Sequence, residues 1–315
     1  MFFVFVISSF QLCVSEKTIV GRSYDQVSGL VNIQYCYFSR TEVQNGNGGV
    51  VYLYNTNSQL QIYDSGFYNC SSLQRGGAVY SYISGYSNIE RVCGYRCKSG
   101  VDGYANFIEI MSSNNINMRM TSCFKSSYFY TSYMSIYFST GNQVIQSVNI
   151  SESKNKYAST MSSWKASSLD CSNCHFVNNY ASEHISIWLD GGKGTQVFSN
   201  NNFINNTQGQ STYGFMYIKD YGEYSLTNSV LDLNSHTLFV VVTGRLTVSH
   251  CSIARYDTFT TGVVTTNNIR FQSASLYPLS LYYHPFCADI FIEQTQTFYI
   301  SKFRFIILQQ LIINI

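Results

Sequence analysis

A hydrophobic position that recurs every 23 to 29 residues constrains the fold of this chain more than any other feature. It carries an aromatic or aliphatic residue and closes a short strand-like segment. These anchor positions are Phe38, Phe67, Tyr95, Phe124, Ile150, Phe176, Phe203, Val230 and Ile253. A second strand-like segment, such as VVYLY or SIWLD, follows about 14 residues after the anchor. Self-similarity at a nearly fixed period is the signature of solenoids and related arrays.

The units between the anchors contain short strands and turn residues such as NGNGG and DGGKG, and no sustained helical period. Such a unit cannot bury its apolar side alone, but coiling stacks each strand on the preceding unit and completes a core. The sequence therefore predicts an all-β protein, a right-handed parallel β-helix (solenoid) of about nine rungs over residues 16–271. The leucine-rich repeat signature LxxLxL is missing, and a propeller blade needs four strands per unit.

The two ends of the chain differ from the repeats. Residues 1–15 are apolar and then turn polar near small residues, which predicts a signal peptide cleaved after Ser15. No basic residue precedes the apolar run, so a fragment that begins inside a strand is the alternative. Residues 272–315 hold both prolines and an apolar end interrupted by charges, short of the roughly 20 apolar residues of a spanning helix. We expect an irregular apolar C-terminal tail there, either a cap of the rod or a truncated terminus.

Composition narrows the class of partner. Charged residues make up 11% of the chain, where about 25% is usual, and the net charge is only +2 with no basic cluster. A nucleic-acid partner is not expected, because such a partner requires a basic patch. Sequons for N-glycosylation begin at Asn69, Asn149 and Asn205, which agrees with an exported glycoprotein. We therefore expect a secreted or cell-surface location.

The second strand of each unit has a centre flanked mostly by apolar residues. These centres are Tyr52, Tyr80, Glu109, Tyr137, Trp164, Trp188 and Tyr217. Side chains alternate between the two sides of a strand, so the flanks are expected in the core and the centres on the outside. The six aromatic centres are the candidate ligand-binding residues. Trp188 is predicted to face solvent, stacked between Trp164 and Tyr217.

Three interpretations of this outward column stay open. Aromatic neighbours on adjacent strands stabilise a sheet by roughly 0.2–1 kcal/mol each without any ligand. An exposed aromatic strip of this extent is also typical of an interaction site, here for glycans or a host-cell surface. Self-association through the strip is the third interpretation.

The acidic residues do not form an obvious catalytic pair. Hydrolysis of a glycosidic bond needs two carboxylates that face each other. The carboxylates at matching repeat positions, Asp102 with Glu183 and Glu109 with Asp190, are three rungs apart, about 14 Å. We therefore predict a protein without catalytic activity. A carbohydrate-active enzyme, either a polysaccharide lyase or a glycoside hydrolase with an acidic cleft built from loops, is the alternative.

The cysteines favour a structural role. Cys93 with Cys97, and Cys171 with Cys174, have the close spacing of metal ligands, but the two pairs lie in distant units and cannot share one zinc ion. No metal or cofactor is predicted. In an exported chain each pair is a candidate disulfide. Small hydrophobic side chains in one core-facing column are the other interpretation, and that column is Cys36, Cys93, Cys174 and Cys251.

Two kinds of short motif recur within the repeats. GGVVY at 48–52 and GGAVY at 76–80 place a glycine pair before a strand, and FVNN at 176–179 and FINN at 203–206 place Phe three residues before Asn. They resemble the GGAI and FxxN repeats of polymorphic outer-membrane-protein-like surface proteins, and similar β-helix repeats occur in surface families of parasitic protists. The resemblance implies a non-catalytic, adhesin-like surface protein. A purely structural rod within a larger surface protein is a further alternative.

Overall fold

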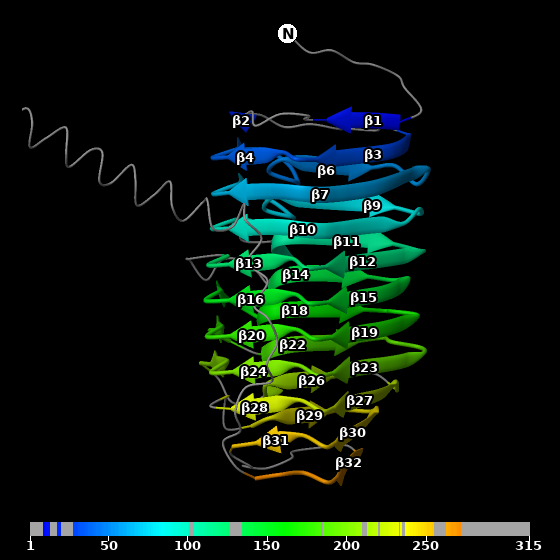
Figure 1. Ribbon diagram of the computed structural model, residues 1–315, viewed down its shortest axis with the longest axis vertical. Coiled ribbons are helices and arrows are strands. Elements are labelled where there is room, and N and C mark those ends of the chain that lie inside the picture. Colours follow the sequence, from blue (N-terminus) through cyan, green and yellow to red (C-terminus); the bar gives the residue numbers. More distant parts are fainter. Residues whose placement is uncertain are drawn as a thin grey trace, which may run out of the picture.

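The computed structural model describes residues 9–12, 18–19, 28–100, 104–126, 134–183, 185–209, 213–219, 221–232, 234, 237–254 and 263–271. Through these residues the chain winds as a right-handed parallel β-helix, with its strands stacked in rungs along a rod (Figure 1). The predicted fold class is confirmed. Of the proposed signal peptide at 1–15 only residues 9–12 are described, and the proposed tail at 272–315 lies outside the described residues.

Three faces of parallel strands form the rod. The first face contains β1 (Ser9–Leu12), β3 (Gly29–Gln34), the first parts of β7 (Ser58–Tyr68) and β10 (Ser87–Tyr95), β12 (Asn115–Arg119), β15 (Asn142–Gln146), β19 (Ser168–Ser172), β23 (Thr195–Ser199), β27 (Glu223–Thr227), β30 (Arg245–Ser249) and β32 (Val263–Asn267). The second face contains β2 (Thr18–Ile19), β4 (Tyr37–Ser39), the last parts of β7 and β10, β13 (Ser122–Phe124), β16 (Asn149–Ser151), β20 (His175–Val177), β24 (Asn202–Ile204), β28 (Val230–Asp232) and β31 (Ser252–Ile253).

The third face is a separate eight-stranded sheet. It contains β6 (Val51–Tyr54), β9 (Val79–Ile83), β11 (Ala105–Ser112), β14 (Met134–Ser139), β18 (Ala158–Trp164), β22 (Ile185–Asp190), β26 (Met216–Ile218) and β29 (Phe239–Val241). Shorter pairings complete the turns: β5 (Glu42–Val43) with β8 (Ser71–Ser72), and β17 (Lys154–Asn155) with β21 (Tyr180–Ala181) and β25 (Thr207–Gln208).

The first and second faces meet at a corner formed by one left-handed residue in each rung. In β7 and β10 this residue is Asp64 (φ 45°) or Arg91 (φ 53°), and the strand continues through the corner. The full set is Tyr35, Asp64, Arg91, Met120, Ser147, Asn173, Asn200, Asn228, His250 and Asn268. Most residues other than Gly, Asn and Asp avoid this conformation, so the stacked hydrogen bonds between rungs impose it.

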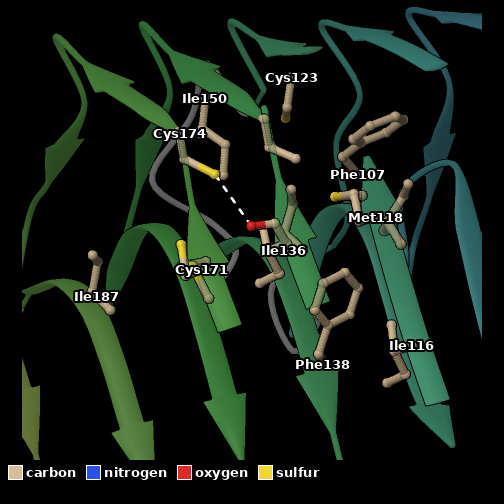
Figure 2. Packing of buried hydrophobic residues seen from close by; sticks show 14 of the residues in the cluster. Phe107, Ile116, Met118, Cys123, Ile136, Phe138, Ile150, Cys171, Cys174 and Ile187 are labelled. Atoms are coloured by element: carbon tan, nitrogen blue, oxygen red, sulfur yellow. Dashed lines mark hydrogen bonds between the residues drawn. The ribbon is translucent and has the colours of Figure 1, made fainter. Parts of the chain in front are cut away.

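Side chains from all three faces fill the interior in stacked layers. Phe38 stacks on Phe67 with ring centroids 5.1 Å apart, and Phe176 stacks on Phe203 at 5.0 Å. Figure 2 shows the same packing in the middle of the rod, where aliphatic, aromatic and sulfur-containing side chains from different strands meet. Burial of this apolar surface, at about 25 cal/mol per Å², is the main favourable contribution to folding.

The predicted anchor column slips by one residue in three rungs: once at Val230, where Leu231 pairs with the anchors Phe203 and Ile253, and in two adjacent rungs nearer the N-terminus. Gly94 and Cys123 occupy the inward positions there, so Tyr95 and Phe124 point outward and stack on each other at 5.7 Å. A Cβ atom on Gly94 would lie 2.5 Å from the ring of Phe107, so the glycine leaves the space that this ring fills. A slip of one residue exchanges the two sides of a strand, and anchor spacing alone does not reveal it.

The glycine pairs are parts of the fold. Gly48 and Gly76 have φ values of +64° and +60°, a conformation that glycine adopts without strain. A Cβ atom on the following glycine, Gly49 or Gly77, would lie 2.1 or 2.0 Å from a backbone oxygen of the neighbouring rung. Each pair therefore provides a left-handed turn and then a close contact between rungs.

The FxxN motifs supply buried amides for the turns. Asn179 Nδ2 donates to the carbonyl oxygen of Ile150 at 2.8 Å and to Oδ1 of Asn206 at 2.9 Å. Asn206 Nδ2 donates in the same way to the carbonyl oxygen of Phe176 at 2.7 Å. These bonds satisfy backbone groups that the turns bury. The motifs that carry the family resemblance thus position the backbone of the turns.

The disulfide predictions are wrong for three of the four cysteines. Cys97, Cys171 and Cys174 are free, and their side chains are buried in the rod. Cys174 Sγ donates to the carbonyl oxygen of Ile145 at 3.5 Å (Figure 2). Cys93 is disulfide-bonded, but not to Cys97, because the slipped register places Cys93 on the outer side of its strand.

The core-facing column of cysteines is confirmed in the other rungs. Cys36, Cys174 and Cys251 are buried, and each Sγ donates to the carbonyl oxygen two residues earlier. Cys93 does not belong to this column. These thiols fill the turn between the first and second faces as small hydrophobic groups.

Candidate functional site

The outer side of the third face carries the predicted column, with one change of register. Successive rungs place side by side Tyr52, Tyr80, Glu109, Tyr137, Ser162, Trp188 and Tyr217. Trp164, expected between Tyr137 and Trp188, is instead paired with Ser139 and Asp190 in the neighbouring outward column. The predicted stacking of Trp188 between Trp164 and Tyr217 is therefore wrong on the Trp164 side, and Tyr217 meets Trp188 edge-on without stacking on it.

The inward side chains of β18 explain this displacement. Met161 and Ser163 are buried in the rod, so Ser162 and Trp164 both point outward. The strand ends at Trp164, and Lys165 then takes a left-handed conformation with φ of 50°. In the sequence, Trp164 has polar neighbours where the other centres have mostly apolar ones. Those polar flanks are the signal that identifies the different register.

Four tyrosines at the N-terminal end of this face stack in register, and we call them the tyrosine ladder. Tyr52 stacks on Tyr80 with centroids 5.5 Å apart and planes at 23°, and Tyr54 stacks on Tyr82 at 5.0 Å and 19°. Since rungs are about 4.8 Å apart, each ring covers the face of the next. Tyr54 and Tyr82 are 50% and 40% exposed. Cross-strand stacking accounts for this part of the column.

The centre of the column is covered, contrary to the expectation of an open strip. Tyr80 is only 4% exposed and Tyr137 only 5%, and Arg75 and Tyr104 lie against them. The guanidinium carbon of Arg75 is 5.5 Å from the Tyr80 ring centroid and 4.3 Å from that of Tyr104. Tyr104 packs on Tyr137 with centroids 5.2 Å apart. Cation–π and aromatic contacts therefore form a second layer here.

Glu109 lies in the column between Tyr80 and Tyr137 and is completely buried. Arg75 Nη2 is 2.5 Å from Glu109 Oε1, and the backbone at Ala105 and Gly76 also favours the charged carboxylate. Burial raises the pKa of Glu109 to about 7, against the lowering effect of the Arg75 charge. Burial also raises the pKa of Tyr80 to about 12 and raises that of Tyr137. Among these groups, Glu109 is the one that changes charge near neutral pH.

Ser162 opens a cavity in the column. Its small side chain stands between Tyr137 and Trp188, which are two rungs apart, about 10 Å. The cavity measures about 260 Å³, and we call it the aromatic pocket. It is lined by Tyr104, Met134, Tyr137, Ser162, Trp164, Trp188 and Asp190. The change of register thus brings both tryptophans of the protein to one cavity without stacking them on each other.

Rings around the aromatic pocket are turned out of the ladder arrangement. Trp188 meets Tyr217 at an angle of 87° with centroids 6.0 Å apart, and Tyr104 is tilted by 38° from Tyr137. In an edge-to-face pair the edge of one ring points at the face of the other. The aromatic side chains at the pocket therefore meet at tilted and edge-on angles, whereas the rings of the tyrosine ladder stack face to face.

A few polar groups accompany these aromatic walls. Ser162 and Asp190 are the polar residues that line the pocket, and Asp190 Oδ2 is 3.6 Å from Lys219 Nζ. Trp188 Nε1 is buried and has no acceptor among the described residues. An unsatisfied buried donor costs about 1–3 kcal/mol, so a ligand with an acceptor at this atom would recover that energy. Apolar walls with a small number of polar groups are the usual composition of a ligand pocket.

A cluster of carboxylates on the first face was not anticipated from the sequence. Arg91 donates to both oxygens of Asp64, at 2.7 and 2.9 Å, and also binds Glu90. Asp64 and Arg91 are corner residues of adjacent rungs, and their matching repeat positions are the signal that could have revealed the pair. Glu90 borders a polar cavity of about 250 Å³, together with Tyr63, Asn88, Ile89, Asn117 and Arg119. One guanidinium holds both carboxylates, so the cluster is an ion-pair network between rungs.

The carboxylates considered in the sequence are not brought together. Glu109 and Asp190 lie in different outward columns, three rungs apart. Glu183 Oε1 is 3.4 Å from Lys156 Nζ, and Asp102 lies outside the described residues. Within the described part of the chain, no group of three or more His, Cys, Asp or Glu side chains is placed to hold a metal ion. A search of the same residues finds no helix long and apolar enough to cross a membrane.

The three sequons occupy different environments. Asn69 and Asn205 are exposed turn residues, each with φ of 50°. Asn205 Nδ2 donates to Asn178 Oδ1 at 2.9 Å. Asn149 is half-buried in β16, and its Oδ1 atom has no hydrogen-bond partner among the described residues. Asn69 and Asn205 are therefore the more accessible glycosylation candidates.

The chain was compared with models of protein families, with curated proteins and with solved structures. No match was found in any of the three comparisons.

Proposed function

We propose that this protein is a non-catalytic, adhesin-like binding protein that takes one sugar ring of a glycan into the aromatic pocket. The observation that carries the proposal is the break of the outward column at Ser162. It leaves a space of about two rungs between Tyr137 and Trp188 on the outer side of the rod. A stabilising stack has no need of such a gap, whereas a flat ligand does.

The chemistry of the pocket favours a sugar over other flat ligands. A sugar ring has C–H faces that pack on aromatic rings and hydroxyls that bond to groups such as the Asp190 carboxylate and the Ser162 hydroxyl. A nucleotide would require cations available for its phosphates. The two nearby ammonium groups are otherwise engaged: Lys219 is paired with Asp190, and Lys165 Nζ lies 4.2 Å from the Trp164 ring centroid.

The proposed setting is a secreted or cell-surface protein related to polymorphic outer-membrane-protein-like adhesins. The low content of charged residues, the sequons and the GGAI- and FxxN-like motifs support it. In that setting the partner is a glycan, free or on a host cell. Self-association through the third face and a purely structural rod are the competing functions.

A glycan array followed by calorimetry on the full chain tests the proposal. The panel contains neutral and acidic oligosaccharides, and the key variant is Trp188→Ala. Binding by the parent protein and a loss of at least about tenfold in the variant are expected, because an aromatic anchor in a pocket carries much of the binding energy. Tyr35→Asn is the matched control: it removes an exposed aromatic residue from the first corner and replaces it with a residue that tolerates the left-handed conformation.

Each other outcome of this experiment points to a named alternative. Equal binding by parent, Trp188→Ala and Tyr35→Asn would place the ligand elsewhere and overturn the proposal. No binding, with sedimentation that depends on concentration and on Trp188, would favour self-association. Release of shorter oligosaccharides, abolished by Glu90→Gln, would instead support the enzyme and place it on the first face.

A further inference from the structure

Arg75 and Glu109 join the tyrosine ladder to the aromatic pocket, and glycan binding alone does not explain them. Glu109 is on β11, and Arg75 is in the turn before β9, one rung away. Their ion pair spans 2.5 Å, and the Arg75 guanidinium lies against the rings of Tyr80 and Tyr104. Tyr104 is a wall of the pocket.

Stability does not explain a carboxylate at this position. Removing a carboxylate from water costs several kcal/mol, and an ion pair repays this only where hydrogen bonds also satisfy the remaining oxygens. For Glu109 the cost of burial outweighs Arg75 and the backbone groups of Ala105 and Gly76, which favour the charged form, because its pKa is raised above the ordinary value. The neighbours in the column, Tyr80 and Tyr137, are aromatic, and Glu109 interrupts their stack with a carboxylate. A buried group that costs stability is expected to serve a function.

We infer that Glu109 is a positioning residue for the aromatic pocket: through Arg75 it holds Tyr104 against Tyr137. We call Glu109, Arg75 and Tyr104 the strut. Only the identity of the ligand rests on the proposed function. The strut itself is a property of the free protein, and it predicts that the pocket loosens when the ion pair is broken.

The ion pair of the strut depends on pH through the protonation of Glu109. The titratable or charged groups that face Glu109 are Arg75, Tyr80, Tyr104 and Tyr137. Arginine stays charged throughout, and a phenol ordinarily loses its proton near pH 10. Glu109 therefore changes charge first, with a pKa of about 7. Below that pH the guanidinium loses its counter-charge, and Tyr104 is released.

Intrinsic fluorescence tests the strut in the full chain without any ligand. Trp164 and Trp188 are the two tryptophans of the protein, and both line the pocket, so tryptophan emission reports on this site alone. Acrylamide quenching is measured from pH 5.5 to 8.5. For the parent we expect quenching to increase as the pH falls, with a midpoint near pH 7. Glu109→Gln and Arg75→Met should both show the acid-form quenching at every pH.

A matched variant and a second readout keep the test decisive. Glu152→Gln removes an exposed ion pair with Lys125, of 3.5 Å, and should retain the parental pH profile. Circular dichroism establishes that each variant is folded. For the tightest-binding oligosaccharide of the panel, Arg75→Met should weaken binding about five- to tenfold, and so should a shift to pH 5.5 in the parent.

The two proposals fail in different ways. A pH midpoint that persists in Glu109→Gln, or parental quenching in Arg75→Met, would overturn the strut even if glycans bind. A midpoint that depends on Glu109 without binding of any oligosaccharide would support the strut and contradict the proposed function.

Discussion

The tyrosine ladder and the aromatic pocket lie on the same face of the rod and are built from the same repeat, yet they have opposite properties. In the ladder, rings lie within 23° of parallel, and each ring face is covered by the next. At the pocket, Ser162 interrupts the column, and the rings meet at 38° and 87°. The comparison shows that in an unbroken aromatic column the rings stack on one another and leave no space for a ligand between them. A binding site arises where the column is broken.

Glu109 separates the two regions, and its ionisation gives the largest expected effect. Its folded-state pKa of about 7 lies above the ordinary value of 4.5, so the folded protein binds more protons than the unfolded chain between these pH values. The free energy of unfolding therefore decreases as the pH rises through this window, by about 3 kcal/mol. Glu109→Gln should remove this contribution, which urea unfolding of both proteins at pH 5 and pH 8 measures.

The sign of that effect is informative about the strut. Ionised Glu109 lowers stability but, by our inference, holds the pocket wall, so affinity and stability should move in opposite directions with pH. A parent and a Glu109→Gln variant with identical pH dependence of unfolding would show that the carboxyl is hydrated, and the separation of the two regions would then need another explanation.

Ser162→Tyr converts the pocket into a continuation of the ladder, and the second-largest effect is expected from it. The new ring fills the gap between Tyr137 and Trp188, so glycan affinity should fall at least about 100-fold, because a central pocket contact carries most of the binding energy. Calorimetry measures affinity, and thermal unfolding should show equal or higher stability. Retained binding with the gap filled would contradict the site assignment.

Tyr82→Ala tests whether the tyrosine ladder contributes to stability and not to ligand binding. Loss of its stack on Tyr54 should lower the free energy of unfolding by about 1 kcal/mol, because an aromatic pair contributes about 0.5–1.5 kcal/mol beyond burial and Tyr82 is partly exposed. Glycan affinity should remain at the parental value. Chemical unfolding and calorimetry on the same preparation separate the two effects, and a clear drop in affinity would make the ladder part of the binding site.

Lys219→Met is expected to have the smallest effect. Its ion pair with Asp190 spans 3.6 Å and is largely exposed, so the free energy of unfolding should change by less than about 0.5 kcal/mol. Affinity for a neutral oligosaccharide should change less than about threefold on the same grounds. A much larger loss, confined to acidic oligosaccharides, would show that Lys219 binds the ligand directly and would sharpen the ligand class to anionic glycans.

The sequence by itself determined the fold. The repeat spacing, the glycine pairs and the FxxN motifs specify a coiled chain, because a short unit of strands and turns buries its apolar side only against its own neighbours. The outward orientation of Trp188 and Tyr217 also follows from strand alternation, since the apolar residues on both sides point into the core and the residue between them therefore points outward.

The tertiary structure alone decided the site. Trp164 lies in a different column from the predicted one because β18 buries Met161 and Ser163. The residues that flank Trp164 are polar, so no alternation of apolar and polar residues indicates the register of this strand. Arg75 and Tyr104 cover this part of the column, and Glu109 is buried there. This arrangement depends on the conformation of the turns, which the repeat pattern of the sequence does not specify. Periodic burial fixes how the rungs stack, whereas the side chains that meet across turns are set only once the rungs are assembled.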